Sequence, residues 1–254
     1  MRIYYQSFLD PERHAPYFER LRAYLSDVAG QDTQIEVGGL SPPDQALSRL
    51  TEFRCSVMTV DNAIAAAESG CEAAVIGHFQ DSGLYEARSA VDIPVLGLGE
   101  SSMLYAGQLG RGFGLVTIDD VFSAWHKEQA DRYGVSERLV GVGSMSAPPD
   151  VLVAAMDDDE AYSKLRAAFE DAARPLVAAG AEVVIPAGGL FGLLAAREQS
   201  YTVDGAVVLN PVALVVKLAR VAVELGLKPC RTGAFALAPP QAVDEFRALV
   251  RGGA

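Results

Sequence analysis

One histidine stands where α/β proteins commonly place reactive groups. His78 follows the apolar run Ala73–Ile76 in the segment V-I-G-H-F-Q-D-S-G, so it lies at the end of a predicted buried strand. Imidazole titrates near neutral pH and can act as a general base or a nucleophile. A neutral histidine that is hydrogen-bonded in a strand-end loop is the structural alternative. The other two histidines, His14 and His126, lie in charged helical surroundings and are expected on the surface.

The residues that follow His78 could bind an anion. Asp81, Ser82 and Gly83 begin a predicted helix, and the first turn of a helix offers N–H groups and a positive dipole end to a carboxylate. Asp81 or Ser82 could instead simply cap that helix. We therefore predict the three as substrate-binding residues and keep capping as the alternative.

Further polar residues follow other predicted strands, at the sheet edge where α/β proteins bind ligands. Gln6 and Ser7 end the first strand and Thr117 ends a later one, and we expect these three to position a substrate. Glu100 follows another strand and is a candidate second acid or base, or a group that orients His78. The alternative for Glu100 is a first-turn carboxylate favoured by the helix dipole.

A run of small residues forms the corresponding turn in the second half of the chain. Ala187, Gly188 and Gly189 follow a second apolar strand. Without side chains, the backbone there can approach a ligand closely. We predict them as substrate-binding residues, and a plain strand-to-helix turn is the alternative.

These residues are positioned by strands and helices that alternate along the whole chain, the pattern of a parallel sheet covered by helices on both faces. The predicted strands are Arg2–Gln6, Gln34–Gly38, Cys71–Gly77, Pro94–Leu98, Gly112–Thr117, Leu139–Ser144, Glu182–Pro186 and Ala206–Leu209. The predicted helices are Pro11–Ala29, Ala46–Ser69, Ser82–Ala90, Ser101–Leu109, Val121–Tyr133, Asp158–Ala179, Gly189–Arg197 and Val212–Leu227.

The second half looks like a copy of the first. Gly70–His78 aligns without gaps to Gly180–Gly188, and a helix and a Val-Asp pair follow in both. We predict two α/β domains related by duplication, residues 1–118 with about 210–254, and residues 119–209. The strand ends of such domains would meet at a cleft, with His78 and Gly188 in equivalent places.

The composition of the chain limits the classes of molecule that it is expected to bind. A formal net charge of −12 argues against nucleic acid and anionic membrane surfaces. Three scattered cysteines, Cys55, Cys71 and Cys230, indicate reduced thiols in a cytoplasmic protein. The sequence has no cluster of His and Cys residues, so we predict no metal site. The start MRIYYQSFLD lacks the apolar stretch of a signal peptide. A small-molecule substrate is the partner that remains.

Several segments together resemble a known family. They are Gly70–Ser101, with G-H-F-Q-D-S-G-L and D-I-P-V-L-G-L-G-E, then Gly112–Thr117, Gly180–Gly189 and Leu225–Pro240. In sequence and order they resemble the Asp/Glu/hydantoin racemase superfamily, especially its hydantoin and allantoin racemase branch. The resemblance implies two flavodoxin-like domains with a pseudo-twofold cleft, cofactor-free chemistry next to a carbonyl or carboxylate, and a homo-oligomer.

The same resemblance implies a catalytic cysteine from each half, at the positions of His78 and Gly188 (or Ala187, if the alignment shifts by one residue). Cys55, Cys71 and Cys230 match neither position. We therefore expect both catalytic cysteines to be replaced and His78 to be the acid or base of a reaction other than two-cysteine racemisation.

Three functions stay open on the sequence. The first is an enzyme of this superfamily that acts next to a carbonyl or carboxylate of a small metabolite. The second is a lyase or hydrolase that decarboxylates its substrate or opens an imide, lactone or hydantoin-like ring. The third is a small-molecule binding protein that has kept the cleft and lost catalysis.

Overall fold

The structure is a computed structural model that describes residues 1–43 and 46–252. The chain forms two compact units, one of residues 1–97 and 215–254 and one of residues 98–214. The first unit contains β1 (Arg2–Gln6), α1 (Ala15–Ala29), β2 (Gln34–Gly38), α2 (Arg49–Glu68), β3 (Ala73–Ile76), α3 (Leu84–Ala90), β4 (Val95–Gly97), most of α9 (Pro211–Glu224) and α10 (Pro240–Arg251). The second contains α4 (Leu98–Ala106), β5 (Phe113–Thr117), α5 (Val121–Arg132), β6 (Leu139–Ser144), α6 (Pro149–Ala154), α7 (Asp159–Ala178), β7 (Val183–Pro186), α8 (Gly189–Ala195), β8 (Thr202–Val203) and β9 (Ala206–Val208).

The first sheet is parallel, with strand order β2-β1-β3-β4. Gln6 of β1 pairs with Ile76 of β3, and Ile76 pairs with Gly97 of β4. Because all strands run the same way, the residues that follow β1, β3 and β4 leave the sheet at one edge. This confirms the predicted common edge for His78 and the end of β1.

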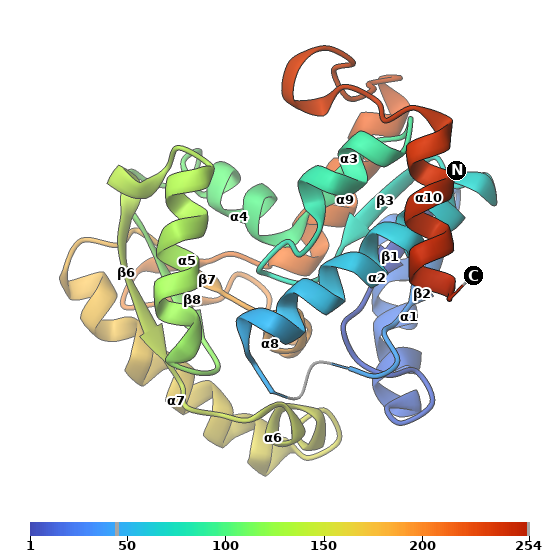
Figure 1. Cartoon of the computed structure of the whole chain (residues 1–254). Helices are drawn as coiled ribbons and strands as arrows, with labels where there is room; N and C mark the ends of the chain where they lie inside the picture. The colour runs from blue at the N-terminus through green and yellow to red at the C-terminus, as the bar shows by residue number, and fades with distance from the viewer. Residues whose placement is uncertain (44–45, 253–254) are drawn as a thin grey trace. The chain divides into compact units, whose positions relative to one another are not determined.

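Helices α2, α3 and α10 cover one face of this sheet. Ala63 and Ile64 of α2 pack in one apolar cluster with Ala74 and Ile76 of β3, and Phe246 of α10 packs against that cluster. Figure 1 shows α10, in red, beside α2. The cluster holds α2 against the carboxyl half of β3, which fixes the helix that supplies a partner for His78.

The predicted domain boundary after residue 118 is wrong. Strand β5 pairs in parallel with both β6 and β7, in a second sheet of order β6-β5-β7-β9-β8. All five residues of β5 are buried, as expected for a central strand covered on both faces. The units therefore divide at Gly97 and Leu98, and again inside α9. The last two residues of the predicted segment 210–254 lie outside the described part of the chain.

The second sheet is not wholly parallel, because β8 runs antiparallel to β9. The turn between them is Asp204-Gly205, with φ of 48° and 91°. Asp-Gly is a favoured pair for such two-residue hairpins, since both residues need positive φ. That sequence signal was present, but the strand before it was not predicted.

Several element bounds differ from the predicted ones. Helix α1 begins at Ala15 rather than Pro11, because the Asp10 carboxylate accepts hydrogen bonds from the N–H groups of Glu12 (2.9 Å) and Arg13 (3.3 Å) and holds a turn there. Helices α6 and α10 were not predicted. Among the described residues, no helix has the length and apolar character needed to cross a membrane.

Candidate active site

His78 lies in a chain of hydrogen bonds inside the first unit. Its Nδ1 is 3.0 Å from the Ser82 hydroxyl oxygen, and that hydroxyl donates to Oε1 of Glu52. His78 Nδ1 and Glu52 Oε1 are 3.6 Å apart. The side chains of His78 and Glu52 are 20% and 14% exposed, so both are largely withdrawn from water but the imidazole is still accessible.

An aromatic ring fixes the plane of the imidazole. Phe8 stacks on His78 with ring centroids 3.9 Å apart and an interplanar angle of 14°. Phe8 itself belongs to the apolar cluster of α2 and β3. The imidazole is therefore held by a ring on its face and by a hydroxyl at its edge.

Helix α2 brings Glu52 to this position. Ser48 begins the helix with a capping box, in which its side chain accepts a hydrogen bond from the Thr51 N–H and the Thr51 side chain accepts one from the Ser48 N–H. Glu52 follows in the first turn, where a carboxylate is favoured by the helix dipole. Sequence reasoning missed Glu52, because its helix position alone did not indicate that it would meet a residue 26 positions later, after β3.

The loop after β3 holds Ser82 in place. The Asp81 N–H donates to the His78 carbonyl at 3.0 Å, and the Leu84 N–H donates to the Asp81 carbonyl at 3.1 Å. Asp81 and Gly83 have positive φ, 55° and 77°. Two left-handed residues turn the chain sharply, so that the Ser82 side chain returns toward His78.

The predicted helix start at Ser82 is wrong, because α3 begins at Leu84 with Gly83 as its N-cap and no side-chain capping bond. The alternative that Asp81 or Ser82 caps this helix is therefore also wrong. Ser82 is hydrogen-bonded to His78 and Glu52 instead. Asp81 is 2% exposed and lies against Gly97 of β4. Substrate binding by the three loop residues stays a prediction.

Gln6 and Ser7 are in the predicted place at the end of β1, and both are buried. The Gln6 side-chain oxygen, Oε1, accepts hydrogen bonds from the Tyr4 hydroxyl (2.9 Å) and the Asn62 side-chain amide (2.8 Å). The Ser7 hydroxyl is 3.2 Å from that of Tyr17. These bonds give both side chains a structural role beside the predicted role in substrate binding.

Glu100 does not follow a strand directly, since β4 ends at Gly97 and Glu100 lies in the first turn of α4. The carboxylate that the structure places beside His78 is that of Glu52. A catalytic role for Glu100 stays a prediction. Thr117 ends β5 as predicted and is fully buried, and its hydroxyl has no hydrogen-bond partner in the described part of the chain.

The loop after β7 contains only Ala187 and Gly188, and α8 begins at Gly189. Gly188 has φ of 174°, which is extended backbone that any residue adopts. No heavy atom of the described residues lies within 4 Å of a Cβ built there. A side chain would therefore fit at this position.

The structure corrects the predicted surface position of one histidine. His126 is fully buried rather than on the surface, because the spacing of Phe122 and His126 puts both on the inner face of α5. Its Nδ1 is 3.1 Å from the Gln129 side-chain oxygen. Cys55 and Cys71 are buried, and Cys230 is exposed.

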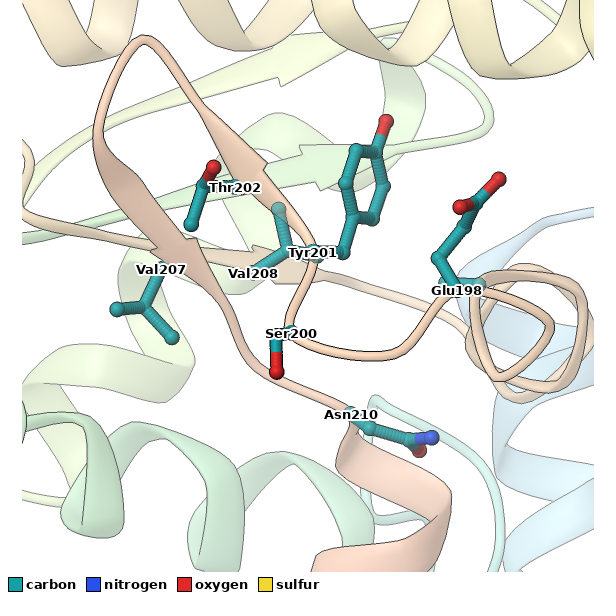
Figure 2. Close-up of a pocket in the computed structure, with 8 residues that line it drawn as sticks. Glu198, Ser200, Tyr201, Thr202, Val207, Val208 and Asn210 are labelled. Carbon is teal, nitrogen blue, oxygen red and sulfur yellow. The ribbon is translucent and has the colours of Figure 1, made fainter.

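A hollow of about 360 Å³ in the second unit was not anticipated. It lies at the carboxyl end of β9, beside β8, and Figure 2 shows the Ser200 hydroxyl and the Tyr201 ring on opposite sides of the chain there. Asn210 on its wall accepts, through its side-chain oxygen, a hydrogen bond from the N–H of Ala213 in the first turn of α9 at 3.0 Å. Glu198 accepts from the Tyr162 hydroxyl at 3.0 Å. Two of its polar groups thus have structural roles.

The comparisons with known proteins identify the class. Two solved structures have a similar fold: allantoin racemase from Klebsiella pneumoniae (TM-score 0.76, 24% identity, 94% of each chain covered) and allantoin racemase from Pseudomonas fluorescens (TM-score 0.75, 19% identity, 94% of this chain and 98% of that one). The protein is thus an α/β protein of two domains whose sheets are parallel apart from the edge strand β8, as in racemase superfamily structures.

Sequence similarity gives the family. Residues 9–219 match the family model described as Asp/Glu/Hydantoin racemase. A hydantoin racemase from Pseudomonas sp. (strain NS671) is 28% identical over 202 residues, which cover 79% of this chain and 78% of that protein. The chain belongs to the Asp/Glu/hydantoin racemase family, which confirms the resemblance seen in the sequence. The replacement of both catalytic cysteines stays a prediction.

Proposed function

We propose that this protein is a cofactor-independent enzyme that moves a proton at an acidic carbon of a small metabolite, next to a carbonyl or carboxylate, with His78 as the acid and base. The observation that carries the proposal is the hydrogen-bond chain from His78 through Ser82 to Glu52. A base that gains a proton is stabilised by a nearby carboxylate, and that of Glu52 lies 3.6 Å from His78 Nδ1 with its side chain only 14% exposed.

The family supports this chemistry. A relative is named a hydantoin racemase, and two proteins of similar fold are named allantoin racemases. The stereocentre in such a ring carries a hydrogen next to a carbonyl, so removal of the proton leaves charge that spreads onto the carbonyl oxygen. Enzymes that catalyse such steps stabilise that oxygen with hydrogen-bond donors.

A single base favours an outcome other than racemisation. The family resemblance implies one acid–base residue at each of two positions, and here the second position is Gly188. No residue of the run Ala187–Gly189 has an ionisable side chain. One imidazole can remove a proton and return it to the same face, or activate water, but inversion also needs a donor on the opposite face. A ring-opening hydrolase or a decarboxylase is therefore the second candidate.

The test is proton exchange in D₂O. The purified protein is incubated with 5-substituted hydantoins and allantoin, and loss of the ring C–H signal is followed by NMR while chirality is followed by circular dichroism. We expect exchange in the wild type and a loss of about 10²- to 10⁴-fold in His78→Gln, the usual contribution of a general base. His14→Gln, which changes a histidine at the start of α1, is the matched control and should exchange at the wild-type rate.

The outcomes separate the candidates. Undiminished turnover in His78→Gln would overturn the proposal. Exchange with inversion would retain His78 but contradict the one-base account. A ring-opened or decarboxylated product would identify the second candidate, and binding measured by calorimetry without any turnover would identify a binding protein.

A further inference from the structure

With Glu52 ionised, the hydrogen bonds around Ser82 run from His78 to Ser82 and from Ser82 to Glu52. An ionised carboxylate accepts hydrogen bonds and donates none, so the single hydroxyl proton of Ser82 points to Glu52. The Ser82 oxygen is then left with lone pairs toward His78. The contact of 3.0 Å therefore requires His78 to donate from Nδ1.

This direction determines the tautomer of the imidazole. In a neutral histidine, one ring nitrogen carries the proton and the other carries the lone pair. With the proton on Nδ1, the basic nitrogen of His78 is Nε2. Glu52 thus orients the Ser82 hydroxyl, and the orientation of that hydroxyl decides which nitrogen of His78 can accept a proton.

The order of the three groups also excludes a nucleophilic role for Ser82. In a serine nucleophile site, histidine lies between the serine and the carboxylate and removes the serine proton. Here the serine lies in the middle and donates a hydrogen bond to the carboxylate. Ser82 is 5% exposed, which also leaves its oxygen little of the access that a nucleophile needs.

We propose that Glu52 and Ser82 are positioning residues, which hold the proton of His78 on Nδ1 and so make Nε2 the catalytic base. Phe8 completes the arrangement, because its stacked ring keeps the imidazole from rotating out of line with Ser82. When Nε2 accepts a proton, the imidazolium lies 3.6 Å from the Glu52 carboxylate and forms an ion pair. This inference rests on the proposed function only in calling Nε2 a catalytic base, since the tautomer is a property of the resting protein.

The test reads the tautomer directly. Two-bond ¹H–¹⁵N NMR of histidine-labelled full-length protein distinguishes the protonated nitrogen from the bare one by their ¹⁵N shifts. We expect neutral His78 to be in the Nδ1–H form in the wild type. Glu52→Gln keeps the size of the side chain, but an amide can present either an acceptor or a donor to Ser82, so we expect a mixture of tautomers.

Exchange rates give the second readout. We expect Glu52→Gln and Ser82→Ala to lower kcat/KM for C–H exchange by about 10- to 100-fold, the value of a charge-assisted hydrogen bond. Ser82→Thr keeps the hydroxyl and should restore the Nδ1–H form. Glu68→Gln, at the other end of α2, removes one negative charge away from the site and serves as the matched control. Amide spectra of each variant verify folding.

The result separates the two proposals. An Nε2–H tautomer in the wild type, or an unchanged tautomer in both Glu52→Gln and Ser82→Ala, would overturn the positioning role even if His78→Gln abolishes exchange. A tautomer that shifts as expected, together with full activity of His78→Gln, would retain the positioning role and overturn the proposed function.

Discussion

The two halves of the molecule build the same helix–strand unit and then end it differently. Helices α2 and α7 both have 20 residues, and strands β3 and β7 both have four, all buried. A glycine with positive φ precedes each strand, Gly70 at 88° and Gly180 at 106°. After β3, residues 77–83 form a long loop before α3, whereas only Ala187 and Gly188 separate β7 from α8.

The difference in loop length decides where side-chain chemistry can occur. The long loop contains His78 and turns back so that Ser82 meets it. The fourth residue of α2 is Glu52, which contacts the loop after β3. The fourth residue of α7 is Tyr162, whose hydroxyl donates a hydrogen bond to Glu198. The first loop is therefore built to hold an ionisable group, and the second presents backbone. Four predictions test this comparison, ordered from the largest expected effect.

Gly77→Ala should be strongly destabilising, whereas Gly188→Ala should not. A Cβ at Gly77 would lie 2.2–2.5 Å from the Tyr5 ring and hydroxyl, while one at Gly188 meets open space in the described part of the chain. We expect Gly77→Ala to lower the free energy of unfolding by about 3 kcal/mol, at the upper end of overpacking costs. Gly188→Ala should leave it unchanged or raise it by less than about 1 kcal/mol. Urea denaturation followed by circular dichroism measures both, and equal losses would contradict the comparison.

Gly83→Ala should cost about 2 kcal/mol, because it combines backbone strain with a clash. Gly83 has φ of 77°, and its Cβ would lie 2.8 Å from the Ser56 carbonyl oxygen. Gly226 has φ of 63° with nothing within 4 Å among the described residues, so Gly226→Ala carries the strain alone. The difference in unfolding free energy between the two variants isolates the clash. If they lose the same amount, the close packing of the first loop against α2 does not limit this position.

Tyr162→Phe should cost about 1 kcal/mol at neutral pH, through the lost hydrogen bond to Glu198. Burial, and then the hydrogen bond to Glu198, raise the pKa of Tyr162 from its ordinary value of 10.0 to about 12. The unfolded chain loses this proton first, so the contribution of Tyr162 to stability falls as pH rises from about 10 to about 12. Denaturation is measured from about pH 9 to about pH 12, the range that includes both pKa values. The free energy of unfolding should fall less steeply with pH in Tyr162→Phe than in the wild type. If the unfolding free energy of both proteins declines with the same slope, the raised pKa of Tyr162 does not contribute to stability as inferred.

Tyr5→Phe should have the smallest effect. The Tyr5 side chain is 1% exposed and its hydroxyl has no hydrogen-bond partner among the described residues. Removing an unsatisfied buried hydroxyl should leave the unfolding free energy unchanged or raise it by up to about 1 kcal/mol. Tyr17→Phe is the matched comparison, because that hydroxyl is 3.2 Å from Ser7 and its loss should be destabilising. A Tyr5→Phe variant as unstable as Tyr17→Phe would point to a partner for the Tyr5 hydroxyl.

Sequence reasoning was most reliable where local pattern and burial agree. Strands β1, β2 and β6 have the predicted bounds, and His78 lies at the predicted strand end. Sequence reasoning failed where the result depends on which strand pairs with which. The apolar run of β5 could have ended the first sheet or begun the second, and its pairing with β7 was not visible in the order of segments.

The sequence by itself determined the alternation of strands and helices, the family and the unusual histidine, because periodicity and motif order are local properties of the chain. Only the tertiary structure decided that Glu52 and Ser82 are the partners of His78 and that Phe8 covers its ring. Those contacts join three segments that are distant along the chain: the residues after β1, the first turn of α2 and the loop after β3. They depend on the packing of α2 and on two left-handed residues in one loop, which no pattern in a single segment specifies.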